Sequence, residues 1–520
     1  MTHQRSASIF FRRGGISQQV NHAQCRADAN GVAAALRKRG FGPGSRIAIH
    51  GATSYEWVLA DLACVLTGAL SVALYPSAPL TRALATIRES GCRLVFTDRA
   101  DAATAAVSAG LDVIFLGDRT NAPDGVVSVA ELLTTEAETP IAATDPRNGP
   151  FTIVSTSGTL SEPKLFAVAA PPLLFTMDRF AEIYGFGAGD RLLLYLPLSH
   201  LPQRMMLYWG LREGLDFVLS DPAHFVTDGH TFEPTLHVTV PRVLEHIRWR
   251  ARKMVPADAP EGPALTQIYQ TLFGPRIRSI FVGSAPTDLA LMSELLAAGL
   301  PVFEVYGTTE LGMIGLNTPA ARLPGTVGQP IPWGEVRLDR TTREVLVRTP
   351  TPFMYGRLVG DRVERWEPDP SAFESTGDVG EFDGQGFLRI IGRIRDFVAL
   401  PSGEKVFIAP IESALAQRTG ADLCHLTLRA DGRLAALLFF ESRAVPDDRL
   451  VLDEIRQANE GLHPWERLKA FAIVDRMPTV EEGCLTETTK PRRHLIDRIH
   501  AASAEWRPVA GPAGPGTETE

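Results

Sequence analysis

Helical and strand-like patterns alternate between about residues 22 and 120 of this 520-residue chain, and no other feature constrains the fold as strongly. Residues 28–39 have helical spacing of apolar side chains, and residues 46–50 have the composition of a strand. Residues 55–66 are helical again, and residues 71–75 are strand-like. Strands separated by helices favour a parallel sheet with helices on its faces. We therefore predict an α/β fold here.

A similar phrase of ten residues occurs at residues 40–49 and again at residues 185–194. Both copies begin Gly-Phe-Gly-x-Gly and end in apolar residues, which places a glycine turn between a helix and a strand. The repeat is consistent with two similar α/β halves. Glycine turns also recur throughout α/β proteins, so ordinary turns explain it equally well.

Later parts of the chain have different patterns. Short alternating strands around residues 335–339 and 344–348 predict a small β-rich subdomain. After Asp396 the pattern becomes a compact α+β unit, with a strand over residues 433–440 and a helix over residues 447–460. We predict a large N-terminal domain over residues 1–394 and a small mobile C-terminal domain over residues 395–506. Residues 507–520 lack core-forming side chains and are predicted to be a disordered tail.

Length and composition narrow the class of protein. A single core rarely serves more than about 250–300 residues, so several domains are expected. Hydrophobic residues make up 45% and charged residues 22% of the chain, as in ordinary globular proteins. A net charge of −8 argues against nucleic acid as a partner. We expect no membrane span, no secretory signal and, with five scattered cysteines, a cytoplasmic location.

The best candidate for a phosphate-binding loop follows the strand-like residues 151–154. It begins at Ser155 and ends at Lys164, and it is rich in hydroxyl side chains and glycine. Small residues allow successive N–H groups to point into one concavity, while hydroxyls and a lysine add donors around phosphate. An ordinary loop has a similar composition, so this motif needs support from others.

Further candidates lie downstream. The strand-like residues 301–305 lead to Tyr306, Gly307, Thr309 and Glu310, a set suited to stacking on a base, contacting phosphate and holding Mg²⁺. The carboxylate of Asp378 can accept hydrogen bonds from ribose hydroxyls. Taken singly, these side chains could equally be turn, capping or core residues.

A lysine and an arginine complete the set. Arg393 adds a guanidinium after Asp378 in the sequence, and Lys490 lies in a basic segment expected to be a loop. An isolated arginine is more often a surface ion pair, and an isolated lysine is more often solvated.

Taken in order, these motifs resemble the adenylate-forming superfamily of acyl-CoA synthetases, nonribosomal adenylation domains and luciferases, over nearly the whole chain. The long-chain acyl-CoA synthetase branch is the most similar, on the evidence of residues 56–63, 196–200, 240–243, 324–330 and 464–467. The resemblance implies an α/β N-terminal domain of two similar subdomains with a small β-rich subdomain, followed by a mobile α+β domain.

The resemblance also implies roles for individual residues. The phosphate loop would contain Thr156, Ser157, Gly158, Thr159 and Lys164. The adenine pocket would contain Ser284, Ala285, Pro286, Tyr306, Gly307 and Thr308. Asp378 and Arg393 would hold the ribose, Thr309 would contact phosphate, and Glu310 would bind Mg²⁺. Lys490 would bridge the attacking acid and the α-phosphate, and Arg395 would be the hinge. His200, Trp209 and Gly312 would border the acid pocket, although a structural histidine and a core tryptophan explain the first two as well.

The phosphate loop departs from the family pattern at three positions. Leu160, Ser161 and Leu165 stand where the family has a threonine and two glycines. Leu160 removes a hydroxyl, and losing glycine restricts the backbone of a moving loop. Altered handling of ATP is therefore one expectation.

We predict an ATP- and Mg²⁺-dependent enzyme that joins an acid to AMP with release of pyrophosphate, and then transfers the acyl group to coenzyme A. The acid is expected to be fatty or aryl, and another small nucleophile could replace coenzyme A. Two alternatives remain at this point: activation of nitrite for diazotisation of an arylamine, and a nucleotide-binding homologue with impaired catalysis. The oligomeric state cannot be read from the sequence.

Overall fold

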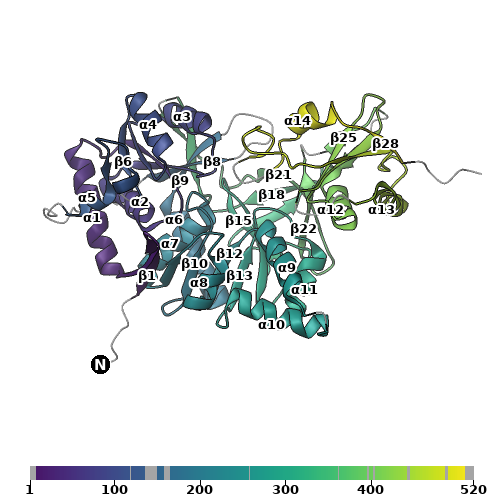
Figure 1. Ribbon diagram of the computed structural model, residues 1–520, viewed down its shortest axis with the longest axis horizontal. Coiled ribbons are helices and arrows are strands. Elements are labelled where there is room, and N and C mark those ends of the chain that lie inside the picture. The colour runs from purple at the N-terminus through teal and green to yellow at the C-terminus, as the bar shows by residue number, and fades with distance from the viewer. Residues whose placement is uncertain are drawn as a thin grey trace, which may run out of the picture.

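The computed structural model describes residues 7–117, 119–134, 149–156, 164–256, 258–360, 362–394, 397–401, 404–441, 446–486 and 490–509. Two large mixed sheets, a small antiparallel sheet and a separate α+β unit make up this part of the chain. In Figure 1 the N-terminal helices lie at the left end of the molecule and the C-terminal unit lies at the right end. The structure confirms the predicted fold class.

The first large sheet has nine strands in the described ranges. Their order is β20 (Arg362–Arg365), β19 (Met354–Val359), β9 (Lys164–Ala169), β8 (Pro150–Thr156), β4 (Leu70–Leu74), β3 (Arg46–His50), β5 (Leu94–Thr97), β6 (Asp112–Phe115) and β7 (Val127–Ser128). Strands β8 to β7 in this order are parallel, and β9 and β19 continue the sheet in antiparallel fashion.

The second large sheet has the same plan in the described part of the chain. Its order is β16 (Gln329–Pro330), β15 (Gly312–Leu316), β14 (Val302–Thr308), β13 (Ser279–Val282), β12 (Leu236–Thr239), β10 (Arg191–Leu194), β11 (Asp216–Leu219), β1 (Ser8–Arg13) and β2 (Ile16–Asn21). The middle strands from β14 to β1 are parallel. Parallel strands extended by an antiparallel hairpin therefore occur in both halves.

Helices connect and cover these strands. They are α1 (His22–Lys38), α2 (Tyr55–Thr67), α3 (Leu80–Glu89), α4 (Ala100–Ser108), the 3₁₀ turn η1 (Arg119–Asn121), α5 (Val129–Thr134), α6 (Ala170–Tyr184), α7 (Leu201–Glu213), α8 (Phe225–Phe232), α9 (Pro241–Met254), α10 (Glu261–Phe273) and α11 (Leu289–Ala297). Helix α1 begins six residues before the predicted helix, because Asn21 caps it by accepting a hydrogen bond from Gln24 N at 2.8 Å. No helix within the described ranges combines the length and the apolar composition that crossing a bilayer requires.

The repeated glycine phrase occupies equivalent places in the two halves. Gly40 and Gly44 have φ of 79° and 81°, and Gly185 and Gly189 have φ of 68° and 94°. The first pair leads from α1 into β3, and the second pair leads from α6 into β10. Since left-handed φ values favour glycine, both turns require it at the same two positions. The phrase thus marks the two similar halves.

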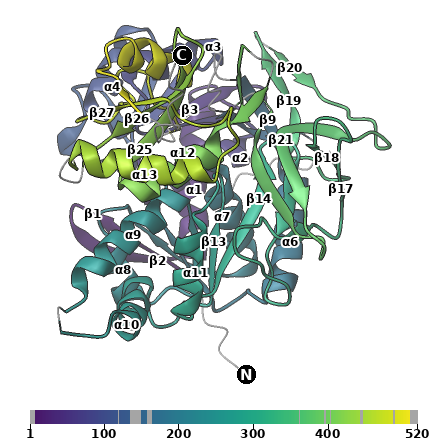
Figure 2. The same ribbon diagram turned by 90° about the vertical axis from the view of Figure 1, so that its right-hand side faces the viewer.

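The small β-rich subdomain is also present. Strands β17 (Glu335–Leu338), β18 (Glu344–Arg348), β21 (Glu374–Phe382) and β22 (Leu388–Arg393) form an antiparallel sheet. Figure 2 shows these strands to one side of the large sheets, beside β19 and β20.

The C-terminal unit has its own sheet and core. It contains the hairpin β23 (Phe397–Ala399) and β24 (Lys405–Phe407), then α12 (Ile408–Thr419), β25 (Leu423–Leu428), β26 (Leu434–Phe439), α13 (Asp448–Glu460), β27 (Ala470–Val474), α14 (Arg493–Ile496), a π-helical turn (Asp497–Ala501) and β28 (Arg507–Pro508). The predicted hinge Arg395 lies outside the described residues, so the domain boundary and the mobility of this unit stay predictions.

The predicted start of the disordered tail was wrong. Arg507 and Pro508 form β28, which pairs with Ala470 and Phe471 at the edge of β27. Arg507 also bonds to Asp448 Oδ2 at 2.6 Å, and its guanidinium lies over the Phe471 ring. Edge pairing and an ion pair hold these residues although their side chains add little to a core. Residues 510–520 lie outside the described part of the chain.

A buried ion pair joins the two halves of the N-terminal domain. The side chains of Arg204 on α7 and Asp61 on α2 are 0% and 2% exposed, and Arg204 Nε donates to Asp61 Oδ2 at 2.7 Å. Arg204 also donates to Thr152 Oγ1 on β8 at 2.8 Å and to Ser71 Oγ on β4 at 2.7 Å. Tyr208 OH donates to Asp61 Oδ2 at 2.5 Å. The network therefore fixes α7 of one half against β8 of the other.

Replacing Arg204 by methionine should lower the free energy of unfolding by about 3–5 kcal/mol, because the Asp61 carboxylate would stay buried without its partner. Urea unfolding followed by far-ultraviolet circular dichroism measures the change. The double variant Arg204→Met/Asp61→Leu should recover much of the loss, since it removes both buried charges. Arg250→Met, on the exposed face of α9, is the control and should change stability by less than about 0.5 kcal/mol. Equal stabilities of Arg204→Met and Arg250→Met would contradict the role given to the ion pair.

Candidate active site

The two ends of the predicted phosphate loop meet in an antiparallel hairpin. Thr156 at the end of β8 pairs with Lys164 at the start of β9. Ser157, Gly158, Thr159, Leu160 and Ser161 lie outside the described residues, so their role stays a prediction. Leu165 pairs with Ser155 in the hairpin and is 8% exposed. The leucine that replaces a family glycine is therefore a core residue of β9.

The segment from Tyr306 to Glu310 folds into a second hairpin. We predicted a strand that ends at Val305, but β14 continues to Thr308 because β15 folds back on it, with a bulge at Tyr306 and Gly307. Thr308 Oγ1 accepts a hydrogen bond from Leu311 N at 3.0 Å, which closes the turn. Thr309 and Glu310 lie in this turn.

Close packing requires both glycines of this hairpin. A Cβ on Gly307 would lie 2.5 Å from the carbonyl oxygen of Gly312. Gly312 has φ of 80°, and a Cβ there would lie 2.8 Å from the Phe353 ring. The turn is also tied to β19, since Met354 N donates to Glu310 O at 2.9 Å. The backbone that presents Glu310 is thus held at three points.

Tyr306, Asp378 and Arg393 form one cluster, as their predicted roles require. Tyr306 OH donates to Asp378 Oδ2 at 2.6 Å, and Arg393 Nε lies 3.2 Å from Asp378 Oδ1. Asp378 and Arg393 are direct partners across β21 and β22. Burial, followed by the charge of Asp378, raises the pKa of Tyr306 well above its usual range. The phenol stays protonated and keeps donating to the carboxylate.

His200, Ser284 and Lys490 form a second group. His200 precedes α7, and its Nε2 lies 3.2 Å from Ser284 Oγ. Ser284 follows β13 with φ of 71°, a strained value for a residue other than glycine. Desolvation of the His200 ring, followed by the positive charge of Lys490, lowers the pKa of His200 to about 4. The positive charge of Lys490 in the C-terminal unit therefore acts on this part of the N-terminal domain, and His200 is neutral at pH 7.

The two groups lie at the same edge of the second large sheet. Strands β13 and β14 are parallel neighbours with Val282 opposite Glu304, so Ser284 and Tyr306 both follow at their carboxyl ends. Ligands of α/β sheets bind at this edge. A contact between domains lies nearby, where Gln417 Nε2 on α12 donates to Asp288 Oδ2 at 2.5 Å. Tyr306, Asp378, His200 and Lys490 thus converge on one region.

Lys490 is presented by a tight turn. Thr486 N donates to Lys490 O at 2.9 Å, and Lys490 N donates to Thr486 Oγ1 at 3.0 Å. Leu485 and Pro491 form an isolated β-bridge at its base.

Trp209 is a core residue. It is 3% exposed, donates from Nε1 to Asp178 Oδ1 at 2.9 Å and packs edge-on against Phe186. These contacts favour the structural alternative, and its place at the acid pocket stays a prediction. Ala285 and Pro286 are exposed beside Ser284.

Glu304, two residues before Tyr306 on β14, was not predicted from the sequence. The residue is 7% exposed, and its Oε2 accepts a hydrogen bond from Gly325 N at 3.3 Å. It also bonds to Thr287, which follows the segment 284–286. Burial, the largest cause, raises the pKa of Glu304 to about 7. The signal in the sequence was a carboxylate at an inward position of a buried strand. Through Thr287, the Glu304 carboxylate supports the segment that contains Ser284.

Glu304 should make stability depend on pH. Its folded pKa of about 7 exceeds the ordinary value of 4.5, so the folded state binds more protons between these values. The free energy of unfolding should then fall as pH rises from about 4.5 to about 7, by up to about 3 kcal/mol. Glu304→Gln should remove this slope, measured as the urea midpoint against pH. Glu89→Gln on the exposed surface of α3 should keep it, and an unchanged slope in Glu304→Gln would refute the assignment.

Known proteins with similar sequences belong to one family. The family described as AMP-binding enzyme matches residues 2–354. A long-chain-fatty-acid–CoA ligase of Mycobacterium bovis is 25% identical over an alignment that covers 94% of this chain and 92% of that protein.

Solved structures have a similar fold. O-succinylbenzoate coenzyme A synthetase from Bacillus subtilis, in complex with ATP and a magnesium ion, superposes with a TM-score of 0.74 at 22% identity, covering 95% of this chain and 97% of that one. An anthranilate CoA ligase in complex with anthranoyl-AMP has a TM-score of 0.77 at 18% identity, covering 96% and 94% of the two chains.

Proposed function

Because this chain belongs to the family of AMP-binding enzymes, we propose that it is an ATP-dependent acid–CoA ligase that acts on a fatty or aryl acid. The similar proteins named above are ligases of a long-chain fatty acid, o-succinylbenzoate and anthranilate. Their acids differ, while coenzyme A and an acyl-AMP chemistry recur. One observation carries the proposal: the charge of Lys490 in the C-terminal unit acts on His200, near the sheet edge where Tyr306 bonds to Asp378 of the small sheet.

The proposed reaction has two steps. An oxygen of the acid carboxylate attacks the α-phosphorus of ATP, and pyrophosphate leaves as the acyl-adenylate forms. The thiol sulfur of coenzyme A then attacks the acyl carbon, a thioester bond forms, the thiol proton goes to solvent or base, and AMP leaves. Both steps need positioning and charge neutralisation rather than a protein nucleophile.

Each group at the sheet edge has a task in the first step. The positive charge of Lys490 offsets the repulsion between the acid carboxylate and the α-phosphate as they approach each other. Neutral His200 adds no charge there and can hydrogen-bond to the acid, as it does to Ser284. Tyr306 offers its ring to adenine, and Asp378 accepts hydrogen bonds from ribose hydroxyls beside Arg393.

The turn at Glu310 fits Mg²⁺. Among the described residues the Glu310 carboxylate has no hydrogen-bond or ion-pair partner, while its backbone is held by Met354 N. Mg²⁺ prefers one or two carboxylates together with phosphate oxygens. Glu310 would hold the ion, with the Thr309 hydroxyl directed at phosphate, and the bound Mg²⁺ would offset the charge of the triphosphate.

Lys490→Ala should lower the rate of adenylation by at least about 100-fold, because the transition state loses a cation. The affinity for ATP should change little, since adenine and ribose are bound by other residues. Pyrophosphate release and equilibrium binding of ATP measure the two effects. Lys469→Ala, which removes an exposed lysine of the same unit, is the matched control. Normal pyrophosphate release by Lys490→Ala would exclude this role.

Asp378→Asn should weaken ATP binding by about tenfold or more, because hydrogen bonds to a charged group contribute about 1.5–3 kcal/mol. Isothermal titration with ATP measures the affinity, and KM for the acid should not change. Glu381→Gln is the control, since Glu381 is exposed on the same strand. Equal ATP affinities of the two variants would contradict a contact between Asp378 and the ribose.

The acid is identified by pyrophosphate release against fatty acids, aryl acids and nitrite, with and without coenzyme A. The proposal expects release with one of the carboxylic acids and a thioester product when coenzyme A is present. Amine-dependent use of nitrite, or ATP binding without turnover, would overturn it.

A further inference from the structure

Three potential metal ligands lie close together next to the turn that carries Lys490. Glu482 and Cys484 precede this turn, and His500 lies in the π-helical turn that follows α14. A carboxylate oxygen of Glu482, the sulfur of Cys484 and a ring nitrogen of His500 all lie within 4.8 Å of one another. Ligand atoms around one tetrahedral zinc ion are about 3.5 Å apart. Small side-chain movements would therefore bring all three onto one ion.

Two of the three residues are buried, and one of them has a ring nitrogen without a hydrogen-bond partner. Cys484 is 0% exposed and His500 is 6% exposed. His500 Nε2 is buried and has no hydrogen-bond partner among the described residues. Leaving such an atom unpaired destabilises a fold, and most buried polar atoms in native proteins have partners. A metal ion would supply one.

A metal ion would have to compete with arginines, because the charges of Arg476 and Arg498 both act on Cys484. Glu482 Oε2 accepts a hydrogen bond from Thr479 N at 3.2 Å, and Glu482 Oε1 lies 3.0 Å from Arg476 Nη1. The Arg476 side chain is 64% exposed, so its ion pair is weak and the guanidinium can turn toward solvent. Arg476 then competes with a metal ion for one carboxylate oxygen.

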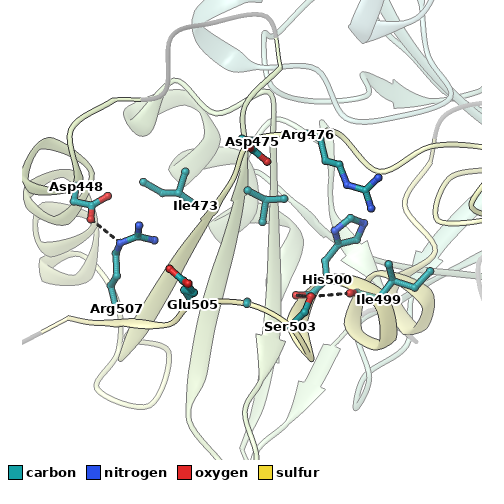
Figure 3. Close-up of a pocket in the computed structure, with 11 residues that line it drawn as sticks. Asp448, Ile473, Asp475, Arg476, Ile499, His500, Ser503, Glu505 and Arg507 are labelled. Atoms are coloured by element: carbon teal, nitrogen blue, oxygen red, sulfur yellow. Dashed lines mark hydrogen bonds and ion pairs between the residues drawn. The ribbon is translucent and has the colours of Figure 1, made fainter.

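One member of the cluster also lines a surface pocket. The pocket, of about 480 Å³, is lined by His500 and Arg476 among others. Figure 3 shows these two side chains beside each other at one end of the pocket, away from Asp448 and Arg507 at the other end. His500 is therefore the member of the cluster that an ion in this pocket can reach.

We propose that Glu482, Cys484 and His500 bind one transition-metal ion of the zinc class in the C-terminal unit. Thiolate and imidazole ligands select Zn²⁺ or Co²⁺ over Mg²⁺ and Ca²⁺, which prefer oxygen ligands. This site is separate from the Mg²⁺ proposed at Glu310.

The ion would act on the segment that presents the lysine. Cys484 O accepts a hydrogen bond from Arg492 N at 2.7 Å, at the base of the turn that ends in Lys490. A bond from Cys484 to an ion shared with His500 would tie this base to the π-helical turn. Bound metal would therefore stiffen the lysine turn.

The test uses the full chain after removal of metals by a chelator and reduction of its thiols. Co²⁺ is added while the absorbance is recorded, and a thiolate-to-cobalt charge-transfer band should saturate at about one equivalent and disappear when Zn²⁺ displaces Co²⁺. Cys484→Ser should abolish the band. His500→Gln and Glu482→Gln should each weaken Zn²⁺ binding by at least about tenfold, as loss of a ligand does. Arg476→Gln should tighten it, since the competing cation is gone.

Cys424→Ser is the matched control, because Cys424 is another buried thiol of the same unit, and it should keep the band. Absence of a band in the unaltered chain overturns the proposal, as does a band that persists in Cys484→Ser. Should Cys484→Ser fail to fold by circular dichroism, unchanged Zn²⁺ affinity in both His500→Gln and Glu482→Gln overturns it. The readout is metal binding alone, so the result does not depend on the proposed ligase activity.

Discussion

The ion pair between Arg204 and Asp61 is the interaction on which the arrangement of the N-terminal domain depends. Both charges are removed from water, and the hydroxyls of Thr152 and Ser71 accept hydrogen bonds from two further donors of the guanidinium. Charges buried in this way require close geometry, because a partner that moves leaves the other charge uncompensated. The pair therefore sets the position of α7, which begins after His200, relative to β8, which leads to the predicted phosphate loop.

The candidate site lies at one edge of the second large sheet because several elements meet there. Strands β13 and β14 end side by side, and the bulge at Tyr306 turns the chain back before Glu310. The small sheet adds Asp378 from β21, and the C-terminal unit adds Lys490. Each large element contributes one or two groups, and none of them could bind a nucleotide alone. The predicted mobility of the C-terminal unit would let Lys490 approach for one step and withdraw for another.

Local patterns predicted the elements well and their ends less well. The alternation over residues 28–75 corresponds to α1, β3, α2 and β4. The pairing of β1 with β11 was not predictable, because the two strands are about two hundred positions apart and no local pattern records which strands become neighbours. Glu304 was missed since a single carboxylate in a strand shows nothing of the burial that raises its pKa to about 7. The tail from Arg507 was misjudged because strand pairing at a sheet edge needs no apolar side chains.

The sequence by itself determined the α/β class, the repeated glycine turns and the chemical groups that a nucleotide site needs. Hydrophobic periodicity and left-handed glycines act through neighbouring residues, so a linear pattern records them. Only the tertiary structure decided that Tyr306 bonds to Asp378, that the charge of Lys490 acts on His200, and that Trp209 packs in the core. Such contacts join residues far apart in the chain, and they follow from how sheets and domains pack rather than from any local preference.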